Sequence, residues 1–211
     1  MRGYLLALVV CMASANAEIV DRISVIIDGH IIKHSDIIKD IRLTDLLNHD
    51  TPTFNVNEQK KALARLIDQA LIRKELQAGL YSSPQPSEVD ALLQQLKQSF
   101  GSEATYRNAL KSYLVSEDDL RKHLNWQLTV LRFINIRFAS GAQVPDAEVR
   151  TYYQQHLPDL RRAGKPKLDL ESLRPEIEQA IAGERVNQQF FAWLDESEKK
   201  TPVTYNEEAL K

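Results

Sequence analysis

The residues with the greatest capacity for chemistry are two histidines, His30 and His34, which stand four positions apart. On a helix this spacing would place two imidazole ligands on one face for a metal ion. The β-branched residues around them predict a strand instead, where positions four apart lie more than about 10 Å from each other. We therefore interpret both histidines as surface residues and expect no metal and no other cofactor.

Serine and acidic residues could form a nucleophile and its base, but each is explained by the start of a helix. Ser35, Ser87, Ser102 and Ser116 stand at expected N-cap positions, and Asp118-Asp119 falls in an expected first turn. No serine lies in the pattern G-x-S-x-G that a strand-to-helix elbow requires. We predict that the protein is not an enzyme.

The aromatic side chains are the better candidates for binding. The helices expected below carry more of them than a single buried face can hold, and adjacent pairs such as Tyr152-Tyr153 and Phe190-Phe191 point about 100° apart on a helix. Exposed apolar surface of this kind is rare on soluble monomers and marks sites that bind other chains. Core packing is the alternative for each residue. The candidate peptide-binding residues are Tyr106, Tyr113, Trp126, Phe133, Tyr152, Tyr153, Phe190 and Trp193.

Trp126 stands apart from the other aromatics. Leu124, Leu128 and Leu131 recur at helical spacing and define the stripe that we expect to be buried, and Trp126 falls off that stripe. We predict that its indole is accessible.

Residues 1–17 have the form of a secretion signal. A positive start precedes Tyr4 to Met12, an apolar run of nine residues, and Ala15-Asn16-Ala17 is a small-x-small cleavage pattern. We predict cleavage after Ala17 and delivery to the periplasm. The apolar run is shorter than the roughly 20 residues of a transmembrane helix, so we expect no membrane insertion.

The sequence also limits the classes of partner. Lys and Arg number 27 and Asp and Glu number 29, a net charge of −2, which argues against nucleic acid because its binding surfaces are strongly basic. The only cysteine, Cys11, lies in the signal, so the processed protein has no disulfide. A lipid anchor on Cys11 is the weaker alternative, because Val10 stands where a small residue is required.

The segment Ile23 to Asp36 predicts a β-hairpin that leads into a helix. Asp28-Gly29 suits a type I′ turn between two β-branched runs, and Ser35 is the expected N-cap. An isolated hairpin is marginally stable in water. Pro202 to Asn206 has strand composition at the other end of the chain. We predict that the two ends meet in one three-stranded sheet.

Helical periodicity dominates the rest of the chain. We expect helices over 57–78, from Ser87, from Ser102, from Ser116 to Phe138, from Pro145 to His156, and from Asp169 or Ser172 to Lys199. The predicted fold is mainly α, a helical domain with a small sheet formed by the N-terminal hairpin and a C-terminal strand. We divide the chain into the signal (1–17), the hairpin with its helical region (18–140), a short helix and loop (141–168), and a C-terminal helix and strand (169–211).

This arrangement resembles the periplasmic chaperones of the SurA type, whose N-terminal domain belongs with the trigger-factor-like peptide-binding domains. The resemblance covers Ile23 to Asp36, the helices up to about Phe138, and the returning helix and strand at the C-terminus. It implies a chaperone domain that binds unfolded polypeptide.

The sequence departs from that family in one respect. Family members usually carry one or two parvulin-type prolyl isomerase modules before the C-terminal helix. Here Val144 to His156 looks like the helix that leads into such a module, and only about a dozen residues separate it from the last helix. We therefore expect a holdase that binds aromatic-rich segments of unfolded envelope or outer-membrane proteins without catalysis. The alternatives are a residual prolyl isomerase, and a non-catalytic assembly subunit or domain-swapped homodimer.

Overall fold

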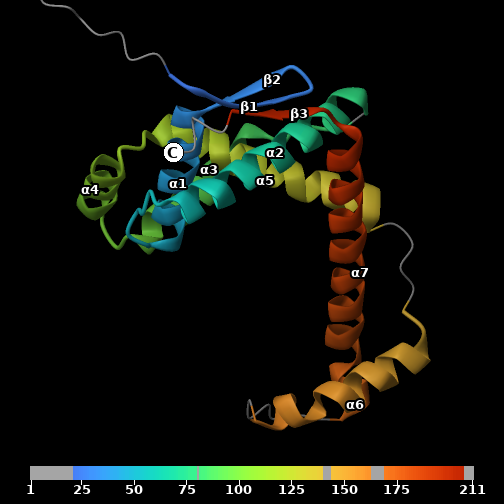
Figure 1. The fold of residues 1–211 in the computed structure, drawn as a ribbon. Coiled ribbons are helices and arrows are strands. Elements are labelled where there is room, and N and C mark those ends of the chain that lie inside the picture. The colour runs from blue at the N-terminus through green and yellow to red at the C-terminus, as the bar shows by residue number, and fades with distance from the viewer. Residues whose placement is uncertain (1–20, 80, 140–143, 163–168, 207–211) are drawn as a thin grey trace, which may run out of the picture.

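The structure, a computed structural model, describes residues 21–79, 81–139, 144–162 and 169–206, so the predicted signal 1–17 lies outside the described residues (Figure 1). The fold is mainly α with one small sheet, as predicted. The elements are β1 (Ile23–Ile27), β2 (His30–Lys33), α1 (His34–Asn48), α2 (Val56–Ala78), α3 (Pro86–Ser99), α4 (Glu103–Tyr113), α5 (Glu117–Phe138), α6 (Asp146–Arg162), α7 (Leu170–Lys200) and β3 (Val203–Tyr205).

The sheet joins the two ends of the described chain (Figure 1). Its order is β2-β1-β3 and both pairings are antiparallel, with Val25 opposite Tyr205 and Ile27 opposite Val203. Asp28 and Gly29 have φ angles of 46° and 80°, the positive values that a type I′ turn requires. The prediction that the hairpin is completed by a C-terminal strand is confirmed.

Two of the predicted serine caps are confirmed. The Ser102 hydroxyl oxygen accepts the N–H of Thr105 at 3.1 Å. The Ser116 hydroxyl oxygen accepts the N–H of Asp119 at 3.1 Å, and the Asp119 carboxylate accepts the N–H of Ser116 at 3.2 Å. This reciprocal pair is the predicted capping box of α5.

The other two predicted caps are wrong. Ser35 lies inside the first turn of α1, whose N-cap is Lys33, and the Ser35 hydroxyl donates to Asp21 instead. Ser87 lies inside α3, which begins one residue earlier at Pro86. Proline suits that first position because the N–H that it lacks would have no partner within the helix.

Two hydrophobic cores lie side by side in the body of the protein. The first packs the sheet against α1, α2, α5 and the end of α7, around Val25, Ile37, Leu63 and Phe133. The second packs α1 and α5 against α3 and α4. Helices α1 and α5 contribute to both cores, which fixes their positions relative to α2.

Helix α6 and the first half of α7 form an arm that projects from this body (Figure 1). Helix α6 packs against the first half of α7 around Val149, Ile177 and Ile181, which form a third, separate core. Helix α6 was expected to end near His156, but it continues through Pro158 to Arg162. The carbonyl that Pro158 leaves unpaired belongs to the exposed Gln154, where water can satisfy it.

Candidate functional site

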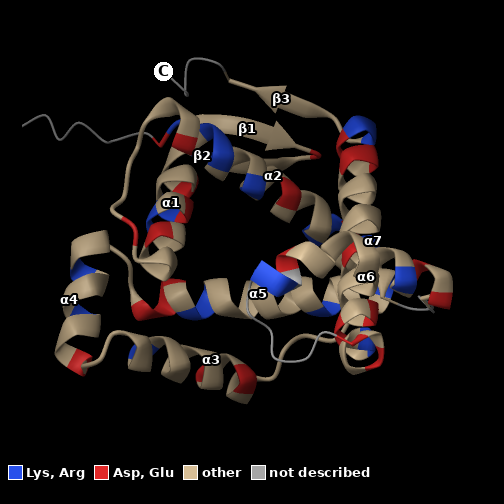
Figure 2. Ribbon diagram, turned by 90° about the horizontal axis from the view of Figure 1, so that it is seen from below, with Lys and Arg blue, Asp and Glu red and all other residues tan. Residues whose placement is uncertain are grey.

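A cleft is lined by side chains of α1, α2, α5 and strand β2. Figure 2 shows how these three helices are arranged relative to one another. The cleft consists of two cavities of about 370 and 570 Å³ that share the side chains of Asp40, Gln69, His123 and Trp126. We call this surface the α1–α2–α5 cleft. Its smaller part is the charged cavity and its larger part is the apolar cavity.

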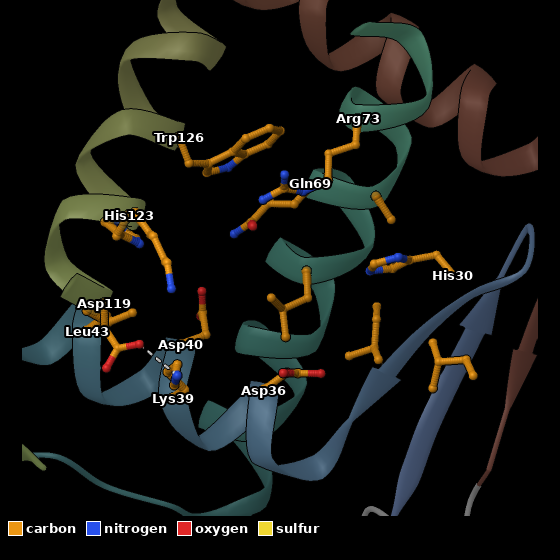
Figure 3. Close-up of a pocket in the computed structure, with 15 residues that line it drawn as sticks. His30, Asp36, Lys39, Asp40, Leu43, Gln69, Arg73, Asp119, His123 and Trp126 are labelled. Atoms are coloured by element: carbon orange, nitrogen blue, oxygen red, sulfur yellow. Dashed lines mark hydrogen bonds and ion pairs between the residues drawn. The ribbon is translucent and has the colours of Figure 1, made fainter. Parts of the chain in front are cut away.

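The charged cavity lies next to β2, and its polar side chains come from four elements (Figure 3). Lys39 of α1 and Asp119 of α5 form an ion pair across it at 2.8 Å. Burial opposes ionisation of Asp119, but hydrogen bonds from Lys39 and Ser116 outweigh it and lower the pKa of this carboxyl to about 2. The pair therefore stays charged at neutral pH and joins α1 to α5 at the rim.

The apolar cavity adjoins the charged cavity at Trp126. Its walls include Leu47, Ile72, Val130 and Leu131. Leu131 is 57 % exposed, so its prediction as a buried residue is wrong. The buried face of α5 shifts along the helix, because Leu124 belongs to the second core and Phe133 to the first.

Trp126 lines both cavities and is partly buried. The guanidinium of Arg73, on α2, lies over its indole with Cζ 4.1 Å from the ring centroid (Figure 3). A cation stacked on tryptophan is attracted by the ring's negative face. The contact holds the indole toward α2, so that it forms a wall of both cavities.

Asp40, which lines both cavities, forms a buried ion pair with Arg65 of the apolar cavity. Asp40 is 5 % exposed, and its carboxylate accepts hydrogen bonds from Nε and Nη2 of Arg65 at 2.8 and 2.5 Å. Burial raises the pKa of Asp40, although Arg65 acts in the opposite direction. Burial also lowers the pKa of His123, so its imidazole is neutral at neutral pH.

Three of the candidate aromatic residues are buried in the cores. Tyr106 and Phe133 have no exposed surface, and Phe190 is 9 % exposed. The ring of Phe133 lies 5.2 Å from Trp193 and 6.5 Å from Phe190, so this cluster docks α7 onto α5. The predicted binding role of these three residues is wrong, because their buried side chains offer no surface to a ligand.

The other candidate aromatics lie outside the cleft, except for Trp126. Tyr113 is half-buried and donates its hydroxyl to the carbonyl of Asp50 at 2.7 Å. Tyr152 and Tyr153 are half-buried in the arm, and Trp193 packs on the first core. The structure therefore does not bring the candidate residues together into one surface.

Sequence reasoning missed most of the residues that form the cleft. Asp40 carried a signal, since it is a charged residue on the buried stripe of α1 between Ile37 and Ile41. Arg73 carried none, because its contact with Trp126 depends on how α2 and α5 cross. Neither helix pattern alone predicts that crossing.

Of the two histidines considered as ligands, His30 lines the charged cavity and His34 is the first residue of α1. Within the described ranges, no three histidine, cysteine or acidic side chains gather as a metal site would require. None of the helices in those ranges is long and apolar enough to cross a membrane. The chain matches neither a protein-family model nor a curated protein.

Proposed function

We propose that the protein is a periplasmic holdase of the SurA type, which binds extended segments of unfolded envelope proteins in the α1–α2–α5 cleft. The observation that carries the proposal is the position of Trp126, a partly buried aromatic side chain that lines both cavities. A chain lying across the indole can place neighbouring side chains in both cavities. Aromatic stacking and apolar contact would recognise many sequences, which suits a chaperone.

The geometry also supports binding without chemical turnover. Charged groups of the cleft are engaged with one another, Asp40 with Arg65 and Lys39 with Asp119. The first pair joins α1 to α2 and the second joins α1 to α5, which explains both pairs as structural contacts. The client is released because its contacts with the cleft are weak and separate, without the use of a nucleotide.

Two parts of this proposal rest on the sequence alone. They are secretion to the periplasm and the expected lack of a prolyl isomerase module. Fractionation of cells that express the full chain tests the first, and we expect the processed protein in the periplasmic fraction, starting at Glu18. A proline-peptide assay tests the second. We expect no rate above the uncatalysed one, and a clear acceleration would favour the isomerase alternative.

Suppression of aggregation tests the proposal itself. The processed protein should slow aggregation of an unfolded outer-membrane protein at equimolar ratio. Trp126→Ala should lose most of this effect. Phe191→Ala is the matched control, because Phe191 is an aromatic residue that is 63 % exposed and lies outside the cleft. Equal loss in both variants, or no effect of the wild-type protein, would refute the proposal.

A further inference from the structure

Arg73 is the one arginine or lysine of the charged cavity that has no acidic partner among the described residues. Lys39 pairs with Asp119, and Lys122 pairs with Asp118 at 2.6 Å. Arg73 is exposed to solvent, and partial burial of its guanidinium in the cleft lowers the pKa of this group.

The acids around Arg73 are engaged elsewhere. In the charged cavity, the Asp36 carboxylate accepts the N–H of Lys33 at 2.9 Å and Asp119 is held by Lys39. Asp28, which shares a smaller cavity with Arg73, pairs with Lys74 at 2.6 Å. The fold thus places a cation at the cleft and leaves it without an internal counterion in the described part of the chain.

The position of Arg73 over the indole also suits it to bind a planar anion. A guanidinium is planar, and its five N–H donors form a rigid fork in that plane. Those donors match the two oxygens of a carboxylate. The Trp126 contact further restricts the side chain before any ligand binds, which lowers the entropy lost on binding.

We propose that the α1–α2–α5 cleft selects extended peptide segments in which an aromatic or large apolar residue stands next to an aspartate or glutamate. The apolar side chain enters the apolar cavity, and the neighbouring carboxylate pairs with Arg73 in the charged cavity. The two cavities adjoin at Trp126, so an extended chain can lie across both, and the carboxylate is that of a side chain within the segment. This inference rests on the proposed function and adds a charge preference to it.

Calorimetric titration of the processed wild-type protein with short peptides, blocked at both ends, tests the preference. The peptides differ only at two adjacent positions: tyrosine-glutamate, tyrosine-glutamine and alanine-glutamate. We expect the first to bind about fivefold tighter than the second, the upper end of what one partly exposed ion pair contributes. The alanine peptide should bind more weakly than both. Blocked ends remove the terminal carboxylate, so the difference reports the side chain alone.

Substitutions locate the preference at Arg73. Arg73→Gln should bind the glutamate and glutamine peptides equally, while Arg73→Lys should keep part of the difference. Lys122→Gln is the matched control, because Lys122 lines the same cavity but is paired with Asp118. It should keep the full fivefold difference, within the approximate range expected for such pairs.

The outcomes separate this inference from the proposed function. If wild-type protein binds the glutamate and glutamine peptides equally, or if Arg73→Gln keeps the difference, the inference is overturned and the apolar binding site stands. If the wild-type protein binds none of the peptides, the proposed function fails together with the inference. The comparison of the glutamate and glutamine peptides uses the wild-type protein, so it tests the inference even if Arg73→Gln folds poorly.

Discussion

The carboxylate of Asp40 on α1 accepts two hydrogen bonds from the guanidinium of Arg65 on α2, at 2.8 and 2.5 Å, and this pair lines the cleft. The carboxylate is buried, whereas Arg65 is partly open to solvent. The pair therefore sets the spacing between α1 and α2. The buried carboxylate of Asp40 depends on the charge of Arg65 to offset the loss of water.

Arg65→Met should destabilise the protein by about 2 kcal/mol at neutral pH, because it leaves a buried carboxylate without its cation. Urea unfolding measures the change. The loss should shrink at acid pH, where Asp40 is protonated and no charge remains buried. Arg107→Met removes an exposed pair with Glu103 and serves as control, with an expected loss of about 0.5 kcal/mol. Equal losses would contradict this role for Asp40.

We expect the free energy of unfolding to depend on pH because of Asp68 on α2. It lines a cavity between α2, α7 and β3 together with Lys60, Glu198 and Tyr205. Burial, with a smaller contribution from the nearby Glu198, raises the pKa of Asp68 to about 6. The native state therefore holds this proton at pH values where the unfolded chain has lost it. As pH rises from about 4 to 6, ionisation of Asp68 reduces stability.

Asp68→Asn removes this effect. The variant should be more stable than wild type by about 1 to 2 kcal/mol above pH 6, and the difference should disappear near pH 4. Urea unfolding of both proteins across this range measures the difference directly. A difference that grew toward acid pH would show that Asp68 is stabilised as the charged form, contrary to our assignment.

The third strand should contribute measurably to stability. Asp28 donates its N–H to Pro202 at 3.2 Å and Asn206 donates to Ser24 at 2.9 Å. In an antiparallel ladder, hydrogen-bonded pairs occur at every second residue. Ile26 and Thr204 face each other midway between these two bonds and are therefore a hydrogen-bonded pair. Thr204→Pro should cost about 2 kcal/mol, because it removes the N–H donor.

Thr204→Val keeps the donor and is the control for the loss of the side chain. Urea unfolding and the protection of the Ile26 N–H from hydrogen exchange are the readouts. If the proline and valine variants unfold at the same urea concentration, closure of the sheet by the C-terminal strand does not stabilise the fold.

The arm should unfold separately from the body. Val149 is fully buried against α7 in a core that shares no residue with the other two. Val149→Ala should weaken the arm by about 2 kcal/mol and speed hydrogen exchange in α6, while exchange in α2 stays unchanged. Thr151→Ala, on the exposed side of α6, should leave both unchanged. Faster exchange in α2 would mean that arm and body unfold together.

The sheet and most helices could be predicted because their signals are local. Asp28-Gly29 determines a turn, Ser116 and Asp119 cap a helix, and the strand at Val203 has an available edge at β1. The errors at Ser35 and Ser87 have a local cause as well. Each serine competes with a neighbouring start signal, Asp36 bound to the Lys33 N–H and Pro86 at the first position of α3.

The cleft could not be predicted to the same extent. Trp126 was singled out because it falls off the apolar stripe of its own helix, and it does line both cavities. The excess of aromatics elsewhere has another explanation. Phe133, Phe190 and Trp193 pack together where α7 returns to α5, a contact between residues far apart in the sequence. A role of Trp126 in peptide binding stays a prediction.

Site-specific photo-crosslinking tests the central claim most directly. A photoreactive phenylalanine analogue replaces Leu131, which is 57 % exposed in the apolar cavity, and in a second protein it replaces Phe191, which is 63 % exposed outside the cleft. Each protein is illuminated while an unfolded outer-membrane protein is diluted from urea. We predict that the client is captured from position 131 and scarcely from position 191. Capture from 191 that equals or exceeds capture from 131 would contradict binding in the α1–α2–α5 cleft.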